Sequence, residues 1–196
     1  MISKVINGQA YDVLSWQDIG DETFIVGKKI IASEESFDRV IALARGGISI
    51  AQNLADLIGV KKISVLQCES YEGIGKTKKP VITQTFTVDI THEKILLVDD
   101  LADSGETLLF VKDYLREQKA ASVKIATLGV KPWTKIMPDY TAIHSKAWVI
   151  FPWETRETIT TLEEIWTQKG NSTDLIEENL GKLGYSKDQI ETFLTS

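Results

Sequence analysis

Short apolar runs and helically spaced apolar positions alternate along the first 165 residues of the chain. The apolar runs and one stretch of period-two alternation predict strands at residues 39–43, 63–66, 81–88, 95–98 and 122–130. Apolar residues at helical spacing predict helices between them, at residues 16–31, 48–58 and 108–115. This succession predicts an α/β fold, with a mostly parallel sheet and helices on both of its faces.

The last thirty residues have a different pattern. A short amphipathic helix is predicted to end at Gly184, and Ser186 with Gln189 forms a capping box for a second helix. We therefore expect a main domain of residues 1–165 and a helical C-terminal appendage of residues 166–196. Packing on the main domain or on a second subunit is the expected role of the appendage, and a separate binding function is the alternative.

The composition excludes several classes of protein. The chain has 196 residues, 43% of them hydrophobic, which is enough for one well-buried domain. Its net charge of −6 argues against non-specific nucleic-acid binding, and its apolar runs are too short to predict a membrane span. The lone cysteine, Cys68, follows an apolar strand and is interpreted as a small core residue, and two distant histidines predict no zinc site. With no recognisable signal peptide, we expect a cytoplasmic protein.

Three unusual loops are predicted to follow strands, at residues 44–47, 69–80 and 99–107. The carboxyl ends of parallel strands meet at one edge of a sheet, and ligands of such sheets bind there. The pattern therefore predicts a single site that these loops form together.

The third of these loops carries the most informative chemistry. The apolar run 95–98 ends in Asp99 and Asp100, and Asp103, Ser104, a glycine and Thr107 follow before a helical pattern begins. A strand that leads into a helix start directs backbone N–H groups toward one point, where a phosphate can bind. Adjacent carboxylates suit ribose hydroxyls and a hydrated Mg²⁺ ion. A ribose 5-phosphate and Mg²⁺ are the predicted ligands, and a merely solvated acidic loop is the alternative.

This segment resembles the phosphoribosyl-pyrophosphate (PRPP) signature of type I phosphoribosyltransferases, with Ser104 in place of the usual threonine. The resemblance implies the fold of that family, including a small hood. It implies that Asp99 and Asp100 hold the ribose hydroxyls and Mg²⁺, and that Asp103 takes a proton from the purine. The residues implied to bind the 5-phosphate are Asp103, Ser104, Gly105, Glu106 and Thr107.

Two further segments resemble parts of the same family. The sequence Arg45-Gly46-Gly47 is similar to the pyrophosphate-binding loop, in which the peptide before the arginine is often cis. Ser70-Tyr71 is similar to the pair that opens the flexible lid of 6-oxopurine phosphoribosyltransferases. The alternatives are a plain glycine-rich turn and a solvated loop.

Base recognition is implied by two more segments. Lys131, after the strand 122–130, resembles the lysine that donates a hydrogen bond to the purine 6-oxo group, and a surface lysine is the alternative. Residues 148–154 resemble the hood of the xanthine–guanine enzymes. That likeness implies that Trp148 stacks on the base, that the backbone near Val149 and Ile150 reads the base edge, and that Glu154, where the family usually has aspartate, helps to hold the magnesium-pyrophosphate. Both tryptophans of the segment could instead be packing residues.

The resemblance covers residues 10–155 and implies an enzyme. The expected reaction transfers the phosphoribosyl group from PRPP to N9 of hypoxanthine, guanine or xanthine and yields a nucleoside 5′-monophosphate and pyrophosphate. Another acceptor base, an idle site, or a regulator that binds PRPP or nucleotides without turnover are the alternatives; Lys131 argues against adenine, because an ammonium group only donates. We expect a homodimer or homotetramer, with no nucleic-acid or membrane partner.

Overall fold

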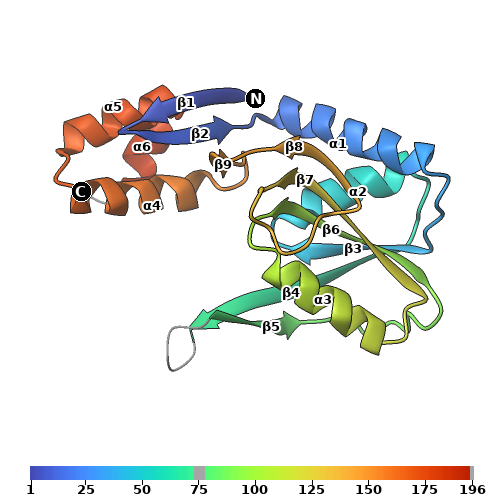
Figure 1. Ribbon diagram of the computed structural model, residues 1–196. Helices are drawn as coiled ribbons and strands as arrows, with labels where there is room; N and C mark the ends of the chain where they lie inside the picture. Colours follow the sequence, from blue (N-terminus) through green and yellow to red (C-terminus); the bar gives the residue numbers. More distant parts are fainter. Residues whose placement is uncertain (73–77, 195–196) are drawn as a thin grey trace. The chain divides into compact units, whose positions relative to one another are not determined.

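The computed structural model describes residues 1–72 and 78–194 (Figure 1). The chain divides into two compact units, one of Ile19–Ser145 and the other of Met1–Asp18 with Lys146–Ser196. No helix in the described part of the chain is both long enough and apolar enough to cross a membrane.

The larger unit contains a six-stranded sheet. Its order is β5 (Lys78–Gln84), β4 (Ile63–Glu72), β3 (Arg39–Ala44), β6 (Lys94–Ala102), β7 (Ser122–Val130) and β8 (Tyr140–His144). Five of these strands run parallel, and only the edge strand β5 is antiparallel to its neighbour. The predicted mostly parallel sheet is therefore confirmed.

Helices cover this sheet because each of its central strands is apolar on both faces. Helix α1 is Trp16–Ala32, α2 is Gly47–Leu57 and α3 is Glu106–Glu117. Alternate residues of β3 and β6 belong to one buried cluster with the apolar side of α3, and α2 packs on β3 and β6 (Figure 1). The cluster under α3 includes Ile41, Leu43, Leu66, Ile95, Leu97, Leu108, Val111, Leu115 and Ile125.

Two strands extend farther than the sequence predicted. Strand β6 continues through Ala102, so Asp99 and Asp100 lie in the strand and only residues 103–105 form the turn before α3. Strands β4 and β5 pair as a hairpin, so the predicted loop 69–80 is wrong at both ends, and residues 73–77 are outside the described part. The strand predicted at 81–88 begins three residues earlier and ends at Gln84. Backbone pairing with a neighbour holds these polar segments extended, whatever their side chains.

The smaller unit combines both ends of the chain. Strands β1 (Ile2–Ile6) and β2 (Gln9–Val13) form a hairpin, and β9 (Trp148–Ile150) pairs with β2 in parallel. The hairpin was not predicted, although its turn is Asn7-Gly8, with φ angles of 51° and 78° that favour those residues. Helices α4 (Thr155–Gln168), α5 (Thr173–Leu183) and α6 (Lys187–Phe193) follow.

These helices share one core with the hairpin. Ile6 and Tyr11 of the hairpin belong to the same buried cluster as Trp166 of α4 and Leu180 of α5. The predicted capping box of Ser186 and Gln189 at α6 is confirmed. The boundary expected after residue 165 falls inside α4, so the structure groups residues 166–196 with the N-terminal hairpin instead of setting them apart.

Candidate active site

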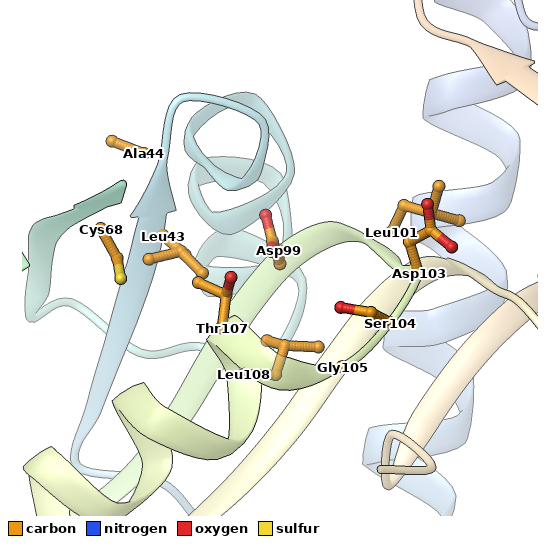
Figure 2. A pocket seen from close by; sticks show the side chains of 10 residues that line it. All are labelled: Leu43, Ala44, Cys68, Asp99, Leu101, Asp103, Ser104, Gly105, Thr107 and Leu108. Carbon is orange, nitrogen blue, oxygen red and sulfur yellow. The ribbon is translucent and has the colours of Figure 1, made fainter. Parts of the chain in front are cut away.

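A pocket lies between the ends of β3 and β6, the middle of β4 and the start of α3. Figure 2 shows Cys68 and Leu43 on one side of it and Asp103 with Leu101 on the other. Its lining residues are Leu43, Ala44, Cys68, Asp99, Leu101, Asp103, Ser104, Gly105, Thr107 and Leu108. The pocket therefore combines carboxylates and hydroxyl groups of the signature segment with the end of β3 and one residue from the middle of β4. Cys68, interpreted from the sequence as a core residue, is only half-buried and lines this pocket.

The turn before α3 has the geometry of an anion site. Gly105 has a φ of 77°, which a glycine adopts without strain, and the chain enters α3 directly after it. The Ser104 hydroxyl accepts a hydrogen bond from the Glu106 N–H (3.3 Å). The first amide groups of α3 and the hydroxyl side chains of the turn thus lie at the positive end of a twelve-residue helix.

Asp99 and Asp100 form an acidic pair at the end of β6. The Asp100 N–H donates to the Asp99 carboxylate at 3.0 Å. Burial raises the pKa of Asp99 well above its usual range, and the neighbouring charge of Asp100 raises that pKa further. A cation at this pair would relieve both effects, because it favours the ionised carboxylates.

The glycine-rich loop after β3 packs against this acidic pair. A Cβ added at Gly46 would lie 2.8 Å from Oδ1 of Asp100 and closer still to its other carboxyl atoms. One added at Gly47 would lie 3.0 Å from the carbonyl carbon of Val98 and closer to its oxygen. Only glycine fits at either position with its neighbours in place. The expected cis peptide between Ala44 and Arg45 is confirmed, and the Arg45 side chain is exposed.

Lys131 is buried, with only 4% of its surface exposed, so the interpretation as a surface lysine is wrong. Its backbone N–H donates to the carbonyl of Ala102 at 2.9 Å, beside the turn before α3. Its ammonium nitrogen lies 5.7 Å from the ring centre of Trp133. The buried lysine is therefore held next to the signature segment within the same unit.

The segment that follows Lys131 supports the turn, and the sequence interpretation missed it. The Trp133 indole N–H donates to Oδ1 of Asp103 at 2.7 Å. The Lys135 N–H donates to the carbonyl of Ser104 at 2.9 Å, and its ammonium group pairs with Glu106. No sequence motif marks these residues; the available signal was an isolated tryptophan two positions after a candidate binding lysine.

The expected hood residues belong to the smaller unit. The Trp148 ring is half-buried, with its centre 6.1 Å from that of Tyr11, while Val149 and Ile150 are buried. Trp153 is a packing residue, since its ring stacks on Phe151 at 4.9 Å. Glu154 precedes α4 at its N-cap position.

The lid residues Ser70 and Tyr71 lie in β4, opposite Pro80 and Lys79 of β5. Their backbone is therefore extended and paired, whereas the sequence interpretation placed them in a loop. Their side chains are outside the described part of the structure.

The acidic pair fits Mg²⁺ better than a metal with a full protein cage. Among the described residues, no group of three or more His, Cys, Asp or Glu side chains could hold a metal ion. Magnesium usually keeps several waters and takes one or two carboxylates together with the phosphates of a substrate. Asp99 and Asp100 beside an anion site match that donor set.

Comparison with known proteins gives a consistent result. The model of the phosphoribosyl transferase domain matches residues 16–159. A xanthine-guanine phosphoribosyltransferase of Gluconobacter oxydans is 29% identical over 148 residues, which cover 74% of this chain and 85% of the relative. A hypoxanthine-guanine phosphoribosyltransferase of Streptococcus pneumoniae is 34% identical over 108 residues, 52% of this chain and 59% of that protein.

A solved structure is similar over most of its length. The purine phosphoribosyltransferase from Pyrococcus horikoshii superposes with a TM-score of 0.66 at 31% identity, covering 73% of this chain and 93% of that one. The family match spans the acidic pair, the glycine-rich loop, the turn before α3 and Lys131. The chain belongs to the phosphoribosyltransferase family.

Proposed function

We propose that the protein transfers the 5-phosphoribosyl group of PRPP to N9 of a 6-oxopurine, namely hypoxanthine, guanine or xanthine. The products are a nucleoside 5′-monophosphate and pyrophosphate. The observation that carries the proposal is a pocket lined by Asp99 and by the helix start, next to which the glycine-rich loop packs on the acidic pair. A buried lysine, Lys131, lies beside the turn before α3 in the same unit. The named substrates of the relatives support the choice of a 6-oxopurine.

The turn before α3 is the proposed binding site of the 5-phosphate. Its amide groups from Asp103 to Thr107 lie at the positive end of the helix, and the hydroxyls of Ser104 and Thr107 add two donors. Asp99 and Asp100 accept hydrogen bonds from the ribose hydroxyls. This division of work follows the charges, because amides and hydroxyls donate to phosphate whereas carboxylates accept from sugar hydroxyls.

The loop of Arg45, Gly46 and Gly47 is the proposed binding site of the pyrophosphate. Its glycines allow the backbone to approach an anion closely, and the exposed guanidinium group can form paired hydrogen bonds with phosphate oxygens. Bound Mg²⁺ would supply positive charge to the departing pyrophosphate. Asp99 and Asp100 would hold the ion, and Glu154 is proposed to help.

Base selection is proposed to rest on Lys131 and the hood. The Lys131 ammonium group donates to the purine O6 and cannot accept from the amino group of adenine. Trp148 stacks on the base, and the backbone at Val149 and Ile150 reads its far edge. Ser70 and Tyr71 belong to the segment that shields the reaction from water.

In the proposed chemistry, N9 of the purine forms a bond to C1 of the ribose as the bond from C1 to pyrophosphate breaks. Pyrophosphate leaves with the electron pair of the broken bond. The proton on N7 of the purine passes to the Asp103 carboxylate, so that the purine product is neutral. Asp103 lines the pocket at the turn proposed to bind the 5-phosphate, and this position supports its proposed role as the base.

The test is a magnesium-dependent assay of PRPP with hypoxanthine, guanine, xanthine, adenine and orotate, scored by monophosphate and pyrophosphate formation. We expect turnover with one or more 6-oxopurines and none with adenine or orotate. Turnover confined to adenine or orotate would contradict the base assignment. Binding of PRPP without turnover of any base would instead favour a regulator.

A pair of variants tests Lys131 specifically. Lys131→Met should raise KM for the preferred 6-oxopurine at least tenfold, because the buried donor to O6 is lost. Lys61→Met is the control: it removes an exposed lysine that lies far from Lys131 in the sequence, and it should leave KM unchanged. Equal kinetics for both variants would remove Lys131 from the base site.

A further inference from the structure

Trp133 is a large aromatic residue at the surface of the larger unit, with 55% of its surface exposed. Burial of apolar area therefore explains little of its presence. Its one polar atom, the indole nitrogen, donates to Oδ1 of Asp103 at 2.7 Å. This distance is at the short end of the range for N–H···O hydrogen bonds, as expected for a carboxylate acceptor.

The backbone around Trp133 is anchored to the turn on both sides. The Lys131 N–H donates to the carbonyl of Ala102, and the Lys135 N–H donates to the carbonyl of Ser104, both at 2.9 Å. These two bonds bracket Trp133 in one segment and Asp103 in the other. The indole group therefore reaches the carboxylate from a backbone whose register against the turn is set.

Contacts at Gly105 leave no room for the two segments to slide past each other. A Cβ at Gly105 would lie 2.6 Å from the Thr134 hydroxyl and 3.0 Å from the backbone nitrogen of Ile136. The first separation is closer than real Cβ contacts and the second is tighter than most of them, so the segment that carries Trp133 packs directly on the turn. A shift of one residue would break this packing and both flanking hydrogen bonds.

The indole group holds one oxygen of the carboxylate. Oδ1 of Asp103 accepts from Trp133, and in the described part of the chain Oδ2 accepts no hydrogen bond. An exposed aspartate without such a partner can occupy several staggered rotamers. An indole N–H only donates, so it restricts the carboxylate without competing for the proton that the carboxylate would accept.

Trp133 also contacts the lysine proposed to bind the base. The Lys131 ammonium nitrogen lies 5.7 Å from the centre of its ring, within the range of a cation–π interaction. In a 6-oxopurine, O6 and N7 lie next to each other on one edge of the base. Trp133 therefore contacts both of the groups that would face this edge, the donor to O6 and the acceptor of the N7 proton.

We propose that Trp133 is a positioning residue that orients Asp103 for proton transfer and aligns it with Lys131 on the O6–N7 edge of the purine. The inference rests on the proposed function, because it assigns a reaction to Asp103. Trp133 acts through the aspartate and the lysine and does not itself exchange a proton with the substrate. It therefore affects the chemical step more than the binding of PRPP.

Trp133→Phe is the informative change, because it removes the indole N–H and keeps an aromatic ring, although a smaller one, beside Lys131. General acid–base catalysis contributes about 10²–10⁴-fold to the rate of a reaction. Because the Asp103 carboxylate would lose its fixed orientation, kcat should fall about tenfold. KM for PRPP should stay within about twofold of the wild-type value, since the substitution changes no residue proposed to bind the 5-phosphate or the pyrophosphate. The same replacement at Trp16, an exposed tryptophan of the other unit, is the matched control and should leave kcat unchanged.

A double-mutant cycle with Asp103→Asn separates positioning from a structural role. If Trp133 acts through Asp103, the Trp133→Phe change should cause no further loss of kcat in the Asp103→Asn protein. Losses that multiply in the double variant would overturn the proposal, as would a Trp133→Phe protein with wild-type kcat. A tenfold rise in KM for PRPP with unchanged kcat would also overturn it.

A measurement without substrate tests the contact itself. The NMR signal of the Trp133 indole proton should shift upfield in Asp103→Ala, because a carboxylate acceptor is lost, and should stay in place in Asp113→Ala on the exposed side of α3. An unmoved signal in Asp103→Ala would overturn the inference. If the wild-type protein turns over no base and the signal still shifts in Asp103→Ala, the proposed function is overturned while the contact between Trp133 and Asp103 is supported.

Discussion

Gly47 is the position at which one added methyl group tests the packing of the site most directly. Its Cβ would lie 3.0 Å from the carbonyl carbon of Val98, 3.1 Å from Cα of Asp99, and closer to the Val98 oxygen. All three are backbone atoms of β6, a central strand that pairs with both β3 and β7. The strand cannot move aside without disturbing those ladders, so Gly47→Ala should strain the sheet itself.

The loss of stability depends on whether the added methyl group clashes with backbone or side-chain atoms. Overpacking against structure that cannot relax costs about 1–3 kcal/mol, and for a domain of this size each 1 kcal/mol lowers Tm by about 2–4 °C. At Gly46 the added methyl group meets the carboxylate of Asp100 instead, and a side chain can rotate away. The Gly46 backbone, with φ −58° and ψ −41°, is suitable for alanine. Gly46→Ala should therefore change stability by less than about 1 kcal/mol but weaken magnesium-dependent PRPP binding about tenfold, because Asp100 is displaced.

The assay is thermal and urea unfolding of both variants, combined with calorimetric titration of PRPP in the presence of Mg²⁺. Gly20→Ala is the matched control, since a Cβ at this helical position meets nothing within 4 Å and should leave the protein as stable or slightly more stable. A Gly47→Ala protein as stable as this control would refute the argument from close approach. Unchanged PRPP affinity in Gly46→Ala would refute the placement of Asp100 at the ligand.

Two further predictions concern ionised groups. Asp99→Asn should raise Tm of the ligand-free protein near pH 8, since burial and Asp100 raise the Asp99 pKa and its charged form destabilises the fold as pH rises above the ordinary aspartate range; a lower Tm for the variant would contradict this. At the opposite end of the sheet, hydrogen bonds from Arg39 (2.7 and 3.1 Å) chiefly lower the Glu93 pKa, with help from Lys62. That stabilisation is complete above the ordinary glutamate pKa and is lost as pH falls through the lower folded value. Glu93→Gln should thus cost about 1.5–3 kcal/mol in urea unfolding at pH 7 and progressively less toward pH 3, and a difference that does not change with pH would count against the ion pair.

The buried strands could be predicted from the sequence because short, continuous apolar runs are typical of strands that are buried on both faces. Strand β7 was predicted at residues 122–130 and has those bounds, and β3 differs by one residue. Seven of the nine residues of β7 are buried, so the apolar pattern and the burial agree. The capped start of α6 was also predictable, because the side chains that cap a helix are its close neighbours in the chain.

The ends of the strands near the site could not be predicted in this way. Asp99 is a polar residue, yet it lies in β6 opposite Thr127 of β7, and Ala102 lies opposite Val130. The main-chain hydrogen bonds of that ladder do not depend on side-chain polarity, so a hydropathy pattern shows where a strand is buried and not where its pairing stops. The same reason explains the hairpin of β4 and β5 in a segment interpreted as a loop.

The supporting contacts of the site were hidden for a different reason. A motif marks residues whose chemistry suits a ligand, and Asp103 and Lys131 are recognisable for that reason. Trp133 has no such chemistry of its own, since it matters through a hydrogen bond to a residue thirty positions earlier in the chain. That contact exists because the chain after β7 follows the turn after β6, an arrangement which depends on the two strands being parallel neighbours. Residues that hold a catalytic group in place therefore become visible only once strand order is known, and the double-mutant cycle between Trp133 and Asp103 measures what the sequence could not reveal.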